Sequence, residues 1–188
     1  MNDLIQNDKN FKEAIGEFII AFSQLEFGLA FLCVFAETDL KSKEDYLSKY
    51  LGFPLDKKLK HLNKYIRNDL FELYRLWEKI QTEIILLNKE RRFLVHGFMS
   101  YSLPREYLST FTKVNGKIEM KNQALEQIKE FTNRVHHLNT GENGINGEFN
   151  ILFTKTRVDK WNESALEIDK IEYRVNSEIL TKRTGNPN

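Results

Sequence analysis

The sequence predicts a mainly α-helical protein of the α+β class, a helical bundle with a small antiparallel β-sheet inserted after the second of two long helices. In two long segments, apolar residues recur at alternating spacings of three and four, which is the period of an amphipathic helix. From Phe98 the apolar period changes to two, which indicates β-strands. Helical spacing returns near Asn122.

The composition is that of an ordinary globular protein. The chain has 188 residues, of which 41% are apolar and 29% are charged, and this excludes a disordered or collagen-like chain. Its 28 basic and 27 acidic residues nearly cancel, so binding to nucleic acid would have to come from a local basic patch. The length predicts one domain, divided into a helical core over 1–97, a β-hairpin insertion over 98–121 and a last part over 122–188.

The single cysteine and the hydropathy of the chain indicate in which cellular compartment we expect the protein. Cys33 is the only cysteine, which excludes an internal disulfide and a Cys-x-x-Cys metal knuckle, and we expect it in the core. The first eight residues lack the basic start and apolar stretch of a signal peptide, and no run of about eighteen uncharged apolar residues occurs. We therefore expect a cytoplasmic protein with no membrane partner.

The first long helix is predicted to begin at a cap formed by Asn7 or Asp8 and to end in the polar run 38–45. Its apolar face is a stripe of eight residues: Phe11, Ile15, Phe18, Phe22, Leu25, Leu29, Leu32 and Ala36. A short helix is expected around residues 44–50, closed by Gly52 and Pro54.

The next helix is predicted from a shorter apolar stripe: Leu55, Leu59, Leu62 and Ile66. Four basic residues share a different face of this helix: Lys57, Lys60, Lys64 and Arg67. They form the most basic surface in the sequence. This face could follow the phosphate backbone of an RNA, or it could be an ordinary solvated helix face.

The second long helix carries an arginine within its apolar stripe. The stripe occupies positions 70, 73, 77, 80, 84, 87, 91 and 94, and position 91 is Arg91. Gly97 is well placed to end this helix, which would put His96 in the last turn or at the cap.

After Gly97 the sequence predicts the inserted sheet and further elements. Asn115-Gly116 is the preferred chemistry for a two-residue hairpin turn, here between segments 111–114 and 117–120. A helix is expected from near Asn122 to the loop 139–147. The remaining expectations are a strand over 149–153, a helix over 161–179 and a frayed tail over 181–188.

Arg91 and His96 are the residues that could carry chemistry. A buried guanidinium without a partner costs several kcal/mol, so Arg91 needs a carboxylate such as Glu26 or Glu90, a wet subunit interface or a ligand phosphate. The carbonyl dipoles at a helix end favour a protonated His96 ring. Such a pair would suit phosphoryl transfer or RNA cleavage. The alternative is structural, a rim arginine and a helix-capping histidine.

The segment Glu90-Arg91-Arg92-Phe93-Leu94-Val95-His96-Gly97 resembles the arginine-x4-histidine signature of the HEPN superfamily (higher eukaryotes and prokaryotes nucleotide-binding). The first helix, with Phe-Ser-Gln-Leu-Glu at 22–26, is similar to the leading helix of bacterial members. Many proteins of this superfamily are metal-independent endoribonucleases of toxin–antitoxin, abortive-infection and CRISPR defence systems. The resemblance covers mainly residues 8–97.

The resemblance implies a HEPN-like fold and a homodimer in which both copies of the motif meet in one cleft. RNA, as single-stranded RNA or tRNA, would be the substrate, and neither a metal nor a cofactor would be needed. An antitoxin or another cognate protein would be a further partner. Arg91 would hold the phosphate. His96 would assist attack by a ribose 2′-hydroxyl or protonate the leaving oxygen, and the product would carry a 2′,3′-cyclic phosphate.

Two alternatives stay open beside this expectation. Family members commonly have a small polar residue after the motif arginine, where this chain has Arg92. The family spacing points to Arg91 as the catalytic arginine, whereas helix geometry puts Arg92 and His96 on one face. The second alternative is a non-catalytic HEPN-fold protein, namely a binding protein or an immunity or regulatory protein that acts through protein–protein contacts. A weaker possibility is that the protein binds nucleotides without cleaving them.

Overall fold

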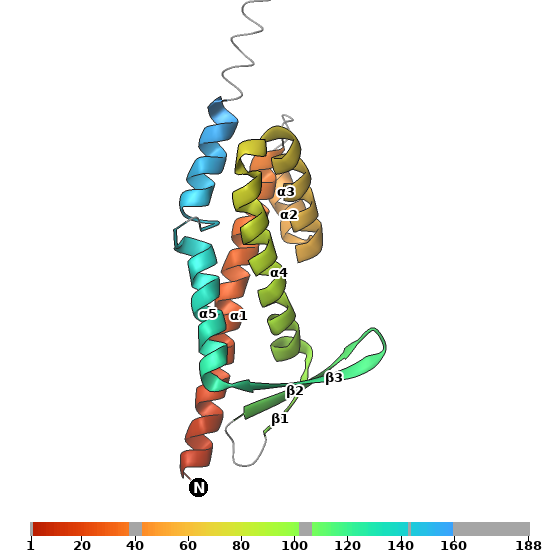
Figure 1. Ribbon diagram of the computed structural model, residues 1–188, viewed down its shortest axis with the longest axis vertical. Coiled ribbons are helices and arrows are strands. Elements are labelled where there is room, and N and C mark those ends of the chain that lie inside the picture. The colour runs from red at the N-terminus through yellow and green to blue at the C-terminus, as the bar shows by residue number, and fades with distance from the viewer. Residues whose placement is uncertain (1, 38–42, 102–106, 143, 160–188) are drawn as a thin grey trace, which may run out of the picture. The chain divides into compact units, whose positions relative to one another are not determined.

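The computed structural model describes residues 2–37, 43–101, 107–142 and 144–159 (Figure 1). The chain divides into two compact units, residues 1–150 and 151–188. The first unit contains all of the sequence motifs discussed above. It is mainly helical and carries a small antiparallel sheet after its second long helix, so the predicted fold class is confirmed at this level.

The helices of the first unit surround one long helix, α1. The bounds of the helical elements are α1 Asn2–Ala36, α2 Lys43–Leu51, α3 Leu55–Asp69, the 3-10 helix η1 Phe71–Leu73, α4 Tyr74–His96 and α5 Leu125–Thr140. Residues 148–159 are also helical. α1 packs against α2, α3, α4 and α5, and its predicted apolar stripe is buried throughout. α1 is therefore the core helix of the bundle.

The sheet follows α4 directly. Its strands are β1 Phe98–Tyr101, β2 Tyr107–Val114 and β3 Lys117–Ala124, in the antiparallel order β1-β2-β3. In the register, Phe111 of β2 is opposite Phe98 of β1 and Met120 of β3. Asn115 and Gly116 both have positive φ angles, of 50° and 83°, as a two-residue hairpin turn of this sequence requires. The predicted hairpin is confirmed.

Several predicted boundaries differ from those of the structure. α1 begins at Asn2, ahead of the expected cap at Asn7 or Asp8. Asn122 lies in β3, and α5 begins at Leu125. The 161–179 helix and the 181–188 tail lie outside the described residues.

The predicted strand over 149–153 is wrong, because these residues are helical. Phe149 and Phe153 are four residues apart, so the five-residue pattern fits a helix as well as a strand. Ile151 is the residue that separates the two periods. Its side chain is 68% exposed, whereas a half-buried strand would bury it on the same face as Phe149.

Gly97 ends α4 at the expected place, but for a different reason than the usual C-terminal glycine. Its φ of −79° is accessible to any residue, so no left-handed conformation is involved. A Cβ at this position would lie 2.3 Å from the carbonyl oxygen of Phe93 and 3.3 Å from that of Phe111. The absence of a side chain therefore allows the sheet to approach the end of α4 closely.

Among the described residues, one helix, over Gln6–Ala36, is long and apolar enough to cross a membrane by length and composition alone. Its most apolar 18-residue window has a mean hydropathy of 2.0, and 56% of that window is buried inside the protein. A core helix of a helical bundle has this composition. The expectation of a cytoplasmic protein stays a prediction.

A pair of glycine substitutions tests the role of Gly97. We expect Gly97→Ala to lower the free energy of unfolding by about 1–3 kcal/mol, because the new methyl group forces the α4 end and β2 apart. Gly16→Ala in α1 is the matched control, since no atom lies within 4 Å of a Cβ there. It should stabilise the helix by about 0.4–1 kcal/mol. Chemical denaturation measures the free energy of unfolding of both variants. A Gly97→Ala protein as stable as the wild type would contradict the close approach of the sheet to α4.

Candidate functional site around Arg91 and His96

Arg91 lies on the buried face of α4, and α1 provides its partners. Its side chain is 25% exposed, between the fully buried Leu87 and Leu94. The Nη1 atom of Arg91 donates to Oε2 of Glu26 at 2.9 Å. The guanidinium carbon also lies 4.7 Å from the ring centroid of Phe22, one turn before Glu26. The carboxylate that this apolar seam requires is therefore that of Glu26.

Glu90 has different partners and does not pair with Arg91. Its carboxylate accepts hydrogen bonds from Nζ of Lys121 and, at 3.0 Å, from Nε2 of Gln123. The Lys121 ammonium lies 5.5 Å from the ring centroid of Phe93. These contacts join α4 to β3, one residue before Arg91. Glu90 therefore anchors the sheet to the motif helix.

His96 is the last residue of α4 and is exposed, as is Arg92. At about 100° per residue, Arg91 and His96 project about 140° apart around the helix, whereas Arg92 and His96 project about 40° apart. The chain therefore puts Arg91 on the inward face of α4, and Arg92 and His96 on the outward face. Within the described part of the chain, His96 forms no hydrogen bond or ion pair.

Several residues of this region were not predicted from the sequence to belong to the site. They are Phe22, Lys121, Gln123 and Asn88, whose Oδ1 atom is buried without a hydrogen-bond partner in the described structure. Phe22 had a usable signal, because it lies four residues before Glu26 and so shares its helix face. Lys121 and Gln123 alternate along β3, but nothing local relates a strand to a carboxylate 31 or 33 residues away.

The predicted basic row on α3 is exposed as expected. The row consists of Lys57, Lys60, Lys64 and Arg67, and within the described residues none of these side chains forms an ion pair with a carboxylate. Lys58, on the other side of the helix, is buried. In Figure 1, α3 lies beside the first half of α4, whereas the sheet and His96 lie at its other end. The structure does not bring the row to the Arg91 region.

A third group of polar side chains joins α1, α2 and α3. The Tyr50 hydroxyl donates to Oε1 of Glu37, which also accepts from Nζ of Lys49 at 3.3 Å. Nε2 of His61 lies 3.1 Å from the same hydroxyl. Burial raises the pKa of Tyr50 far above its ordinary range, and the hydrogen bond to Glu37 adds to this. Burial lowers the pKa of His61, although the Glu37 charge opposes that shift.

Cys33 lies beside this group and is fully buried, as predicted. Its thiol lies 3.7 Å from the carbonyl oxygen of Lys58. Burial raises the pKa of Cys33 to about 12, so almost none of the thiol is ionised at neutral pH. Cys33 is therefore a packing residue.

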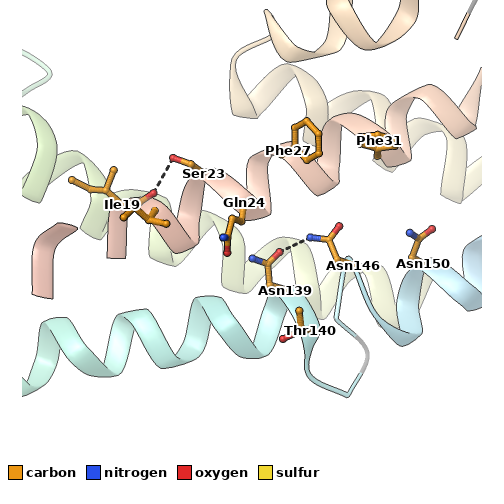
Figure 2. A pocket seen from close by; sticks show the side chains of 10 residues that line it. Ile19, Ser23, Gln24, Phe27, Phe31, Asn139, Thr140, Asn146 and Asn150 are labelled. Atoms are coloured by element: carbon orange, nitrogen blue, oxygen red, sulfur yellow. Dashed lines mark hydrogen bonds between the residues drawn. The ribbon is translucent and has the colours of Figure 1, made fainter. Parts of the chain in front are cut away.

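A hollow of about 750 Å³ lies over α1 and the end of α5, apart from the motif (Figure 2). Its lining contains apolar, hydroxyl and amide side chains but no charged one: Ile19, Ile20, Ser23, Gln24, Phe27, Phe31, Asn139, Thr140, Asn146 and Asn150. The Asn146 amide donates to Oδ1 of Asn139 at 2.8 Å. Neither Arg91 nor His96 lines this hollow.

The side chains at the motif define what chemistry this region can supply. They are a guanidinium with one N–H group on Glu26, a solvent-exposed imidazole and the second, exposed guanidinium of Arg92. Guanidinium groups bind phosphate, and imidazole transfers protons near neutral pH. In the part of the chain that the structure describes, no three His, Cys, Asp or Glu side chains gather in a group that could hold a metal ion.

A double-mutant cycle on Glu26→Ala and Arg91→Ala measures their pair. We expect a coupling energy of about 1–2 kcal/mol, because the ion pair is three-quarters shielded from water and stacked on Phe22. The control cycle uses Lys9 and Glu13, both in α1. Their side chains are largely exposed, and the Lys9 Nζ atom lies 3.6 Å from Oε1 of Glu13. That cycle should give about 0.3–0.5 kcal/mol. Equal couplings would show that Glu26 does not hold Arg91.

The lowered pKa of His61 predicts a pH-dependent stability. The unfolded chain binds a proton on His61 near its ordinary value of 6.5, but the folded protein does so only at lower pH. This contribution to stability is therefore complete above pH 6.5 and is lost as the pH falls through the lowered pKa. Urea titrations between pH 7.5 and 5 should show a shallower loss of stability for His61→Gln than for the wild type. His136→Gln, at an exposed position, should match the wild type.

Comparison with known proteins leaves these residues and their geometry as the basis for a function. No family model matches the chain, and no curated protein or solved structure matches it either. The resemblance of the motif to the HEPN superfamily therefore stays an expectation drawn from the sequence.

Proposed function

We propose that this protein is a HEPN-like, metal-independent endoribonuclease that acts as a homodimer in the cytoplasm of a bacterium. Its setting would be a toxin–antitoxin, abortive-infection or related defence system, with a cognate antitoxin as a protein partner. The observation that carries the proposal is the placement of Arg91 and His96 on α4. Arg91 is fixed by Glu26 and Phe22, and five residues later an unengaged His96 ends the same helix.

The divergence of the two side chains supports a site made from two subunits. A phosphate beside the Arg91 of one protomer is on the opposite side of α4 from the His96 of that protomer, as their angle of about 140° requires. A two-fold axis at the end of α4 would bring the His96 of the second protomer to the same phosphate. Ile85, Leu86 and Val95 are exposed apolar residues of α4 and supply surface for such a contact.

The chemistry would be an in-line transesterification. The 2′-oxygen forms a bond to the adjacent phosphorus, and the bond from phosphorus to the 5′-oxygen breaks. The His96 of the second protomer accepts the proton of the 2′-hydroxyl, and the leaving oxygen takes a proton from water; the imidazolium then neutralises the hydroxide that is left. The products are a 2′,3′-cyclic phosphate and a 5′-hydroxyl. Arg91 stabilises the charge that develops on the phosphate, using N–H groups that Glu26 leaves unoccupied.

One observation favours the second function, a non-catalytic HEPN-fold protein that acts through protein contacts. The Glu26 carboxylate already neutralises Arg91, so this arginine has a sufficient structural role without a phosphate. Arg92 would then be the cation that remains available next to His96. A substitution at each arginine separates the two functions.

The test is cleavage of total bacterial RNA in excess EDTA by the full chain. We expect fragments with 2′,3′-cyclic phosphate ends from the wild type, and a rate lowered by about 100-fold or more for His96→Ala. Arg91→Ala should lose activity to a similar degree, whereas Arg92→Ala is the matched control one position along the helix and should stay within about tenfold of the wild type.

Each variant is first checked for an unchanged melting temperature, since Arg91→Ala also removes an ion pair. The Arg91→Lys variant keeps the charge, and it should recover stability more completely than activity because lysine lacks the planar fork. Absence of cleavage by folded, dimeric wild-type protein would sink the ribonuclease proposal and leave the protein-binding function. Activity lost in Arg92→Ala instead of Arg91→Ala would reassign the catalytic arginine.

A further inference from the structure

The basic row of α3 ends next to an aromatic pair, of which Phe71 is exposed and Tyr74 is half-buried. No acidic residue occurs between positions 57 and 68, and the row extends over eleven residues, or about 15 Å of helix. At its far end the Arg67 guanidinium lies 6.0 Å from the ring centroid of Tyr74. The Tyr74 ring is in turn parallel to that of Phe71, with 3° between the planes and 6.2 Å between the centroids. The basic row thus ends beside two aromatic rings.

Phe71 is the unusual member of this arrangement. It lies in η1, between α3 and α4, and is 69% exposed, although its neighbours Leu70 and Leu73 are buried. A phenylalanine gains stability from burial, so its exposure here is not explained by packing. Its orientation is defined by the parallel Tyr74 ring. A flat apolar face is therefore held in solvent at the end of a basic surface.

The charges near Phe71 show which part of a nucleic acid each group would take. Asp69 and Glu72, two residues before and one residue after Phe71 in the sequence, are exposed, and their negative charge disfavours a phosphate in this part of the surface. A neutral base meets no such opposition and can stack on the ring. The lysines of the row have no carboxylate partner within the described structure, and they suit the phosphates.

We infer that the α3 row and Phe71 form a binding site for single-stranded RNA, in which the backbone follows Lys57, Lys60 and Lys64 to Arg67 and an unpaired base stacks on Phe71. A duplex does not suit it, because its bases are already stacked and paired. The inference rests on the proposed function in that it takes RNA as the substrate. It places the RNA-binding site beside the first half of α4, whereas His96 is at the other end of this helix.

The test measures equilibrium binding of a fluorescein-labelled oligoadenylate of about ten nucleotides to the His96→Ala protein in EDTA, so that binding is seen without cleavage. Phe71→Ala should weaken binding by about tenfold or more, and Phe71→Trp should retain it. Phe27→Ala is the matched control, at an exposed phenylalanine of α1 that is 49% exposed, and should bind like the parent.

Salt dependence separates the two parts of the site. Lys64→Ala should reduce the slope of log K against log salt by about 0.7, whereas Phe71→Ala should leave the slope unchanged. Inorganic polyphosphate of equal length has the charge but no bases, so it should bind more weakly than the oligoadenylate and be insensitive to Phe71→Ala. Polyphosphate binding as tight as RNA binding, or RNA binding unchanged by Phe71→Ala, would overturn the inference.

The outcomes also distinguish this inference from the proposed function. If RNA binding depends on Phe71 but the wild-type protein cleaves no RNA, the RNA-binding site is supported and the ribonuclease proposal is wrong. If cleavage needs His96 but RNA binding is unchanged by substitution of Phe71 or Lys64, the ribonuclease proposal is supported and the proposed RNA-binding site is wrong. If the protein binds no oligoadenylate even at low salt, the inference is wrong.

Discussion

The ion pair between Arg91 of α4 and Glu26 of α1 is the interaction on which the alignment of these two long helices depends. The apolar face of α4 is complete except at Arg91, and α1 meets that position with Glu26 and Phe22. An uncompensated guanidinium there would cost several kcal/mol, so the pair favours one alignment of α4 along α1 over others that bury the same leucines. Apolar packing alone sets the alignment of two helices less strictly.

The same helix also carries the sheet. Glu90 accepts hydrogen bonds from Lys121 and Gln123 of β3, and Gly97 lets the backbone of β2 come against the last turn of α4. His96 lies between these two attachments, at the corner where the helix becomes a strand. The inserted sheet thus limits where the end of α4, and therefore the exposed imidazole, can move. This gives the sheet a positioning role that its own surface does not indicate.

The elements with strong periodicity could be predicted, and the reason is physical. The stripes of α1 and α4 bury one face over many turns, and the Asn115–Gly116 turn needs two positive φ angles that few other residue pairs adopt. The segment 149–153 was misassigned because five residues fit both periods. At the site, the apolar context of Arg91 showed that it needs a partner. The choice of Glu26 over Glu90 depended on how α1 and α4 meet, which is a tertiary property.

Arg91 and His96 point in different directions from one helix, so the proposed site is completed by two protomers. Mixing Arg91→Ala and His96→Ala proteins, each inactive alone, distinguishes this shared site from a site within one protomer, once subunit exchange has been shown. The mixed dimer holds one intact Arg91 and one intact His96 on different chains, and RNA cleavage in EDTA should return to a substantial fraction of the wild-type rate. A mixture that exchanges subunits and still cleaves nothing, beside an active wild type, would contradict the shared site.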